Sequence, residues 1–272
     1  MFAALMRHEA RLQLRPLAVI TGIAALVVAL AAVFTLLDVE VLHGFGVVIG
    51  IVALIAYPLA VFALLVVSYY RSMYGSHGYF TMSLPVDGKV LYWAKFLWAW
   101  LVSLAATAIS IGFKLFQMWI DDVRDRGRRG DAAVSSLGEL GRMVADRGAV
   151  VAVVGAGVVL LLAAYVAILG FVVTAGSGPR LNRLGAGGPA VMGALTYVAM
   201  QLALLVSILA IPLGLRLDGE GIAIVHHSFV TDLTNRTSTS LLPVGWVPAL
   251  VLIGAGLAVW TVNAVRHHTS LR

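Results

Sequence analysis

The sequence of 272 residues contains no cysteine and few charged residues. The lack of cysteine excludes disulfides, thiolate metal ligands and cysteine nucleophiles, although it does not indicate a cellular compartment. Charged residues make up 12% of the chain and hydrophobic residues 61%. A soluble domain has about 25% charged and about 45–50% apolar residues. This apolar content is too large for one water-soluble core, and the composition therefore predicts a membrane protein.

Motifs for nucleotide binding and catalysis are also missing. The sequence has no G-x-x-x-x-G-K-[ST] phosphate-binding loop, no H-E-x-x-H and no G-x-S-x-G. The histidine pairs 226–227 and 267–268 do not form a metal site alone, because adjacent side chains on a helix point about 100° apart. We therefore predict that the chain is not an enzyme and that it binds no cofactor or metal itself.

Six apolar blocks are long enough to cross a bilayer, whose core of about 30 Å needs about 20 helical residues. Lys95 lies near one end of the third block, where its ammonium can reach water at the interface. The alternation typical of membrane barrel strands is absent. We predict an all-α integral membrane protein with a single transmembrane domain. Its six expected spans cover residues 17–37, 46–69, 90–113, 149–175, 189–215 and 244–265.

The first fifteen residues are expected to form a separate element. Apolar side chains such as Phe2 and Leu5 fall on one helical face, while Arg7 and Arg11 can reach lipid headgroups. This pattern favours a short interfacial amphipathic helix over residues 1–15, with the chain turning into the membrane at Pro16. The alternative is a frayed basic tail.

Six spans place both termini on one side of the membrane. The segments on the N-terminal side carry ten basic residues and two acidic ones, whereas the other side carries nine basic and eleven acidic ones. Because cytoplasmic loops are enriched in Lys and Arg, both termini are expected to be cytoplasmic, with 70–89 inside and 114–148 and 216–243 outside. The segment 114–147 alone has seven basic residues, so a five-span alternative with a half-inserted hairpin stays open. We interpret the net charge of +6 as contact with membrane lipids, and not as binding to nucleic acid.

A charged residue deep in a span would mark an ion route, and none is evident in the six blocks. The most notable polar residue is Gln201, near the middle of the fifth block. Its amide can bond to a neighbouring helix or contact a substrate, and the interhelix contact is the preferred interpretation. The pattern does not support an ion-coupled transporter, since the chain also shows no inverted repeat.

The segment between the second and third blocks is rich in glycine and aromatic residues. Residues 74–86 read Tyr-Gly-Ser-His-Gly-Tyr-Phe-Thr-Met-Ser-Leu-Pro-Val. The glycines permit turns, and Pro85 ends any helix that precedes it. Exposed aromatic side chains are a liability in water unless they pack on headgroups or on a protein partner. The aromatic residues of this kind are Tyr74, Tyr79 and Phe80.

This segment resembles one in the permease subunits of ABC-2-type transporters, many of which carry Tyr-Gly-acid-acid-Gly-Tyr-Leu-Thr-x-x-Leu-Pro-Val at the same place. Ser76 and His77 stand here where acidic residues are common in that family. Over the rest of the chain the similarity is limited to a basic amphipathic start, six spans and a long outer segment. The matching residues are Tyr74, Gly75, Gly78, Tyr79, Thr81, Leu84, Pro85 and Val86.

The resemblance implies the membrane permease subunit of an ATP-driven transporter, which we expect to be an exporter. The apolar spans favour an amphiphilic substrate over a sugar or a metal ion. The resemblance implies two copies of a separate cytoplasmic ATPase, which hold ATP and magnesium, and a second permease, identical or paralogous. It also implies a bacterial inner membrane location and short helices that cap the outer exit within 216–243. The residues expected to form the ATPase-coupling loop are Tyr74, Gly75, His77, Gly78, Tyr79, Phe80, Leu84 and Pro85.

Two functions from other classes remain as alternatives. The first is a non-transporting membrane scaffold or sensor subunit that anchors a signalling partner. The second is an integral membrane enzyme acting on lipid, which the missing catalytic cluster disfavours. A neighbouring gene for a Walker-motif ATPase would favour the transporter, and a neighbouring kinase gene would favour the sensor.

Overall fold

The structure is a computed structural model that describes most of the chain. The described residues form two compact units, and they include six helices that are long and apolar enough to cross a membrane, as the sequence predicted. Unit 1 comprises Met1–Ser68 and Leu97–Gly148, and unit 2 comprises Tyr69–Phe96 and Ala149–Arg272. The described residues are 2–37, 39–75, 87–129, 135–178, 181–185, 187–218, 221–231 and 241–267.

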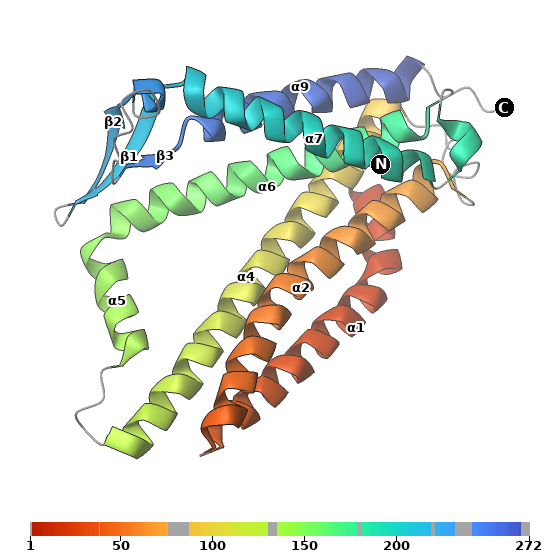
Figure 1. Ribbon diagram of the computed structural model, residues 1–272. Helices are drawn as coiled ribbons and strands as arrows, with labels where there is room; N and C mark the ends of the chain where they lie inside the picture. Colours follow the sequence, from red (N-terminus) through yellow and green to blue (C-terminus); the bar gives the residue numbers. More distant parts are fainter. Residues whose placement is uncertain are drawn as a thin grey trace. The chain divides into compact units, whose positions relative to one another are not determined.

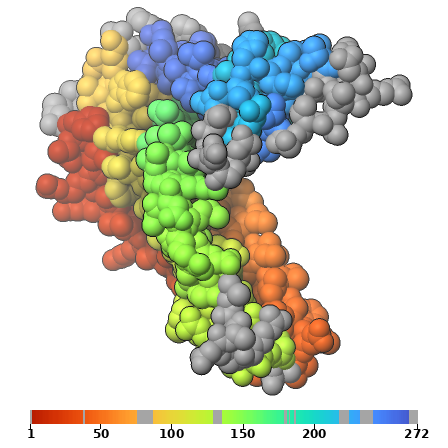
Figure 2. Space-filling model, turned by 90° about the vertical axis from the view of Figure 1, so that its left-hand side faces the viewer, coloured from red at the N-terminus to blue at the C-terminus, as the bar shows by residue number. Residues whose placement is uncertain are grey.

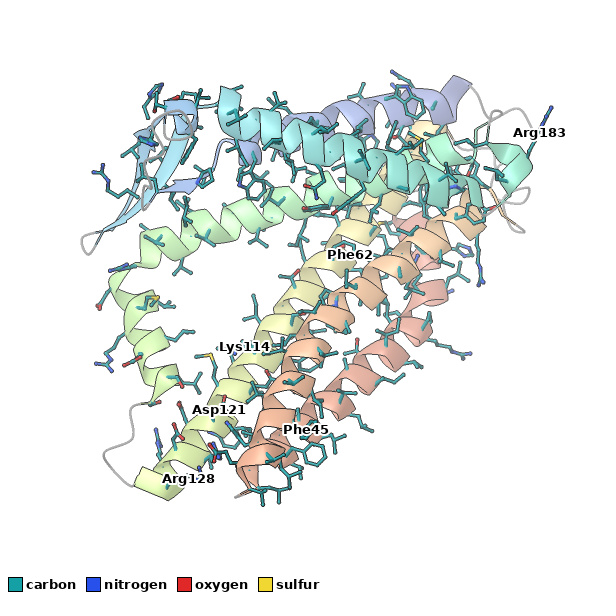
Figure 3. All side chains as sticks on the ribbon, viewed as in Figure 1. Phe45, Phe62, Lys114, Asp121, Arg128 and Arg183 are labelled. Carbon is teal, nitrogen blue, oxygen red and sulfur yellow. The ribbon has the colours of Figure 1, made fainter. Side chains whose placement is uncertain are left out.

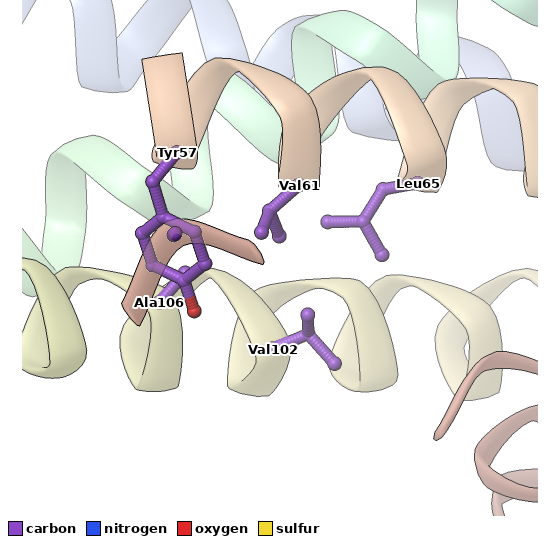
Figure 4. Close-up of a cluster of buried hydrophobic side chains, with 6 residues drawn as sticks. Tyr57, Val61, Leu65, Val102 and Ala106 are labelled. Atoms are coloured by element: carbon purple, nitrogen blue, oxygen red, sulfur yellow. The ribbon is translucent and has the colours of Figure 1, made fainter. Parts of the chain in front are cut away.

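Three helices of unit 1 run side by side, namely α1 (Phe2–Leu36), most of α2 (Glu40–Met73) and most of α4 (Gly88–Arg129) (Figure 1). Unit 1 also contains α5 (Ser136–Asp146), which follows α4 in the chain. Its core lies where α1, α2 and α4 meet, with Ala24 of α1 buried against the other two helices. Figure 4 shows the remaining members, which are Tyr57, Val61 and Leu65 of α2 and Val102 and Ala106 of α4.

Unit 2 combines apolar helices with a small sheet. Its helices are α6 (Gly148–Gly176), the short 3₁₀ helix η2 (Asn182–Leu184), α7 (Gly187–Ala210) and α9 (Trp246–His267), and it also holds the adjoining ends of α2 and α4. The core forms two clusters. In one, Tyr92 of α4 packs with Ala167 of α6 and Ala258 of α9. In the other, Ile168 and Val172 of α6 pack with Leu250 of α9.

The first predicted element is wrong in one respect: residues 1–15 do not form a helix separate from the first span. The single helix α1 continues through Pro16, which lies inside it. A proline removes one backbone hydrogen bond, but packing can hold the helix on both sides of it. Here the N-terminal half is held, because Glu9 and Gln13 are 7% and 5% exposed and Gln13 bonds to side chains of α2 and α4.

The third helix is longer than the predicted span. Residues 90–113 were expected to cross the membrane, but α4 extends to Arg129. Its 42 residues measure about 63 Å at 1.5 Å per residue, twice the thickness of a bilayer core. Charged residues end an apolar span without ending a helix, and this is why the two boundaries differ. Lys114, Asp121 and Arg128 all lie on this part of α4 (Figure 3).

The segment after α7 contains a sheet in part of the region where the resemblance implied short helices, whereas residues 229–231 are helical and 232–240 lie outside the described residues. Strands β1 (Leu213–Asp218) and β2 (Gly221–His226) form an antiparallel hairpin, and β3 (Leu242–Pro243) pairs with the other edge of β1. The sheet lies where α7 ends and α9 begins (Figures 1 and 2). Pro212 prevents the helix from continuing, and the alternating apolar residues that follow have the period of a strand. The fifth predicted span, 189–215, was therefore too long at its end.

Helix α5 begins at a carboxylate supplied by α4. Asp122 is 5% exposed, and its Oδ1 and Oδ2 accept hydrogen bonds from the backbone N–H groups of Ser136 at 2.8 Å and Leu137 at 3.1 Å. The hydroxyls of Ser135 and Ser136 also donate to this carboxylate. A negative charge at these free N–H groups stabilises a helix N-terminus. Asp122 therefore fixes where α5 starts and ties it to α4.

We expect Asp122→Ala to release α5 from α4 within unit 1. Loss of a capping side chain costs about 0.5–2 kcal/mol, and the four donors lose their acceptor together. Amide hydrogen exchange in residues 136–146 should become about 2- to 30-fold faster, while exchange in α1 stays unchanged. Asp125→Ala removes the same charge from the same helix and is the matched control. Equal acceleration by both variants would show that charge, and not the cap, holds α5.

Candidate functional site

The residues on both sides of the predicted coupling loop are described, and they form a polar cluster in unit 2. Of the expected loop residues, Tyr74 and Gly75 belong to this part of the chain. We call the cluster the loop root. The loop-root residues are Tyr69, Ser72, Tyr74, Lys95 and Thr174. The other expected loop residues, His77, Gly78, Tyr79, Phe80, Leu84 and Pro85, lie outside the described residues.

Helix α2 ends directly at the loop root. The backbone N–H groups of Tyr74 and Gly75 both donate to the carbonyl oxygen of Tyr70, each at 2.9 Å. Two donors on one carbonyl close the last turn of the helix and satisfy a group that would otherwise be left open at a helix end. The start of the sequence motif is therefore anchored to α2 by its own backbone.

Thr174 of α6 bonds to a tyrosine of α2 close to this helix end. Its side chain is 6% exposed, and its Oγ1 lies 3.3 Å from Oη of Tyr69. Burial raises the pKa of Tyr74, and the nearby Thr174 hydroxyl opposes that rise. The phenol of Tyr74 is therefore protonated at neutral pH and keeps its O–H for hydrogen bonding.

Lys95 ties α4 to the last turn of α2. Its Nζ donates to Oγ of Ser72 at 2.8 Å, and this hydroxyl in turn donates to the carbonyl oxygen of Tyr69 at 3.1 Å. Lys95 is only 5% exposed, so the expectation that its ammonium reaches water is wrong. A buried ammonium needs hydrogen-bond acceptors in place of water, and the hydroxyl of Ser72 is one of them.

The other end of the predicted loop is anchored as well. Asp87 starts α4, because its Oδ1 accepts from the N–H of Lys89 at 3.1 Å. The next residue, Gly88, approaches α9 so closely that a Cβ here would lie 3.1 Å from Cγ1 of Val265. A few residues later Tyr92, 1% exposed, fills the space between α6 and α9. The α2 end of the loop is therefore held against α6, and the α4 end is held against α6 and α9.

The structure does not bring Gln201 into the loop root. This residue lies on α7, and its side chain is exposed. Its contact with another helix or with a substrate stays a prediction. Within the described part of the chain, no group of three or more His, Asp or Glu side chains could hold a metal ion.

A second polar network, in unit 1, was missed by the sequence analysis. Gln13 of α1 donates from Nε2 to Oγ of Ser68 at 2.8 Å, and its Oε1 accepts from Nε1 of Trp98 at 3.0 Å. Nε2 also lies 3.3 Å from Oε2 of Glu9, one helical turn away. The signal was available, since Glu9 and Gln13 are four residues apart on one helical face. The pair was not recognised as part of a buried network, because residues 1–15 were expected to lie on the membrane surface.

In comparisons with known proteins, no protein-family model, curated protein or solved structure matches the chain. The functional argument therefore depends on the sequence of residues 74–86, on the six apolar helices and on the contacts of the loop root.

Proposed function

We propose that the chain is the membrane-spanning permease subunit of an ATP-binding-cassette transporter of the ABC-2 type, driven by a separate ATPase. The observation that carries the proposal is the sequence Tyr74–Val86, whose first residue belongs to the loop root. Six apolar helices support a multi-pass protein, and the chain has no nucleotide-binding motif of its own. ATP and magnesium belong to the partner.

The loop root supports a mechanical role for the segment that it holds. A coupling element must adopt different contacts in two states, and it must be attached to the helices that it moves. At the loop root Tyr69 contacts α6 through Thr174, and at the other end of the loop Gly88 contacts α9 through Val265. A partner that displaces residues 76–86 therefore acts on the ends of four helices of unit 2, namely α2, α4, α6 and α9.

The proposal includes an assembly and a location. Two ATPase copies and a second permease, identical or paralogous, complete the transporter in a bacterial inner membrane, with both termini in the cytoplasm. The excess of basic residues on the N-terminal side supports this orientation. The substrate is an amphiphilic molecule moved outward, which the apolar character of the spans favours over a sugar or a metal ion.

The test is to purify the tagged chain from its own host and to measure ATPase activity in lipid vesicles. We expect a stoichiometric ATPase partner, with binding weakened about tenfold or more by Tyr79→Ala, because an aromatic anchor at an interface dominates its affinity. Gly78→Pro should weaken binding as well, since it removes a backbone N–H and the freedom of a turn. The matched control is Tyr197→Ala, because Tyr197 is 65% exposed on α7. The proposal fails if the chain purifies without a nucleotide-binding subunit and both loop variants behave like the wild type.

A further inference from the structure

Thr174 is the loop-root residue that belongs to α6. Tyr69 belongs to the last turn of α2, and Tyr74 follows the end of that helix. The phenol of Tyr69 lies 3.3 Å from the threonine hydroxyl on α6, which is 105 residues away in the chain. This hydroxyl therefore links α6 to the end of α2 that leads into the predicted coupling loop.

A hydrogen bond transmits movement differently from an apolar contact. Apolar packing is non-directional, so one surface can slide along another without a large change in energy. A hydrogen bond weakens steeply when its distance or angle changes. When Tyr69 moves with the end of α2, its bond to Thr174 must break or α6 must follow. Burial of Thr174 favours the second outcome, since a buried hydroxyl that loses its partner has no water to replace it.

Helix α6 is suited to carry such a movement further. Thr174 lies near its C-terminal end, and the preceding turns are buried against other elements of unit 2. Ile168 and Val172 pack with Leu250 of α9, and Ala167 packs with Tyr92 of α4. Because packed helices move as rigid elements, a shift at Thr174 reaches these contacts without further side-chain rearrangement.

We infer that Thr174 is a positioning residue that couples movement of the loop root to helix α6. This inference rests on the proposed function for its physiological meaning. The Thr174 hydroxyl acts after the ATPase has docked. This hydroxyl determines how much of the partner's movement reaches the membrane helices, and it does not determine whether the partner binds.

Thr174→Val tests the inference, because valine keeps the shape and removes only the hydroxyl. In vesicles with the ATPase partner, we expect binding of the partner to stay within about twofold, while transport per ATP hydrolysed falls about 2- to 10-fold, the effect of one lost hydrogen bond. Thr174→Ser keeps the hydroxyl and should restore coupling. Thr196→Val is the matched control, because Thr196 is also buried in unit 2 but its hydroxyl has no partner among the described residues.

A second measurement separates this inference from the proposed function. In the purified chain without any partner, Thr174→Val should accelerate amide exchange about 2- to 10-fold in residues 69–75 and around 170–176, as should Tyr69→Phe. The effects should not add, since both variants break the same contact. If wild-type protein recruits no ATPase, the proposed function fails, while the exchange data still decide whether Thr174 links the segments. If the partner binds and Thr174→Val couples and exchanges like the wild type, the inference is overturned.

Discussion

Replacing Gly254 by valine should force α9 away from α6, so that most of the protein no longer folds. A Cβ at Gly254 would lie 2.8 Å from both Cα and Cβ of Ala164, closer than real Cβ atoms approach other atoms. The Cα cannot rotate away as a long side chain can, so the helices must move apart. We expect a loss of about 3 kcal/mol or more in the free energy of unfolding, at the upper end of overpacking effects.

The six apolar helices suggest a membrane as the surroundings of the protein, and a membrane would make this contact important. Lipid chains are as apolar as leucine, so two helices gain little from hiding apolar surface from lipid. They associate through close packing, which small residues at the interface permit. Gly254 and Ala164 form such a pair, and the neighbouring Leu250, 1% exposed, packs beside them.

Gly256→Val is the matched control for this prediction. Gly256 lies on the same helix two residues away, and a Cβ there meets nothing within 4 Å. The same substitution should therefore change the unfolding free energy by only about 0.5 kcal/mol, the difference in helix propensity. Thermal unfolding in lipid nanodiscs, followed by helical circular dichroism, measures both variants. Equal effects of the two substitutions would contradict the packing argument.

The sequence predicted the two ends of an apolar helix well where polar residues directly flank its apolar block. The fourth block, 149–175, differs from α6 by one residue at each end, because Arg147 precedes it and a polar segment follows. It predicted α1 and α4 poorly, because hydropathy reports where lipid can surround a helix and not where the helix ends. Helix α4 continues for sixteen residues beyond the expected boundary at 113, through a segment rich in charged residues.

The loop root could be predicted only in part. The motif located Tyr74 and Gly75, because turn-forming and aromatic residues in this order are visible in one sequence. Thr174 was not predicted, since its contact with Tyr69 joins positions 105 residues apart. Burial of Lys95 was missed for a similar reason: its acceptor, Ser72, lies on another helix. Hydropathy ranks each residue alone, whereas the energy of a buried polar group depends on its partner.

The Gln13 network is a stronger link than any single contact of the loop root. One amide joins three helices of unit 1, through Ser68 on α2, Trp98 on α4 and Glu9 on α1 itself. Such bonds contribute about 0.6 kcal/mol each on average in membrane proteins, up to about 1.7. Loss of the shared amide removes all three together, and it also takes an acceptor from the indole N–H and a donor from the Ser68 hydroxyl.

We therefore expect Gln13→Leu to lower the free energy of unfolding by about 2–4 kcal/mol, although leucine has a similar volume and a higher hydropathy. Gln117→Leu is the matched control, because Nε2 of Gln117 is buried without a hydrogen-bond partner among the described residues. The same substitution there removes an unpaired polar group, so stability should stay equal or rise. Thermal unfolding of both variants in nanodiscs measures the contrast. A stable Gln13→Leu variant would mean that apolar packing alone holds α1 against α2 and α4. If only Gln13→Leu lowers the stability, as we expect, the Gln13 network is the main attachment of the N-terminal half of α1.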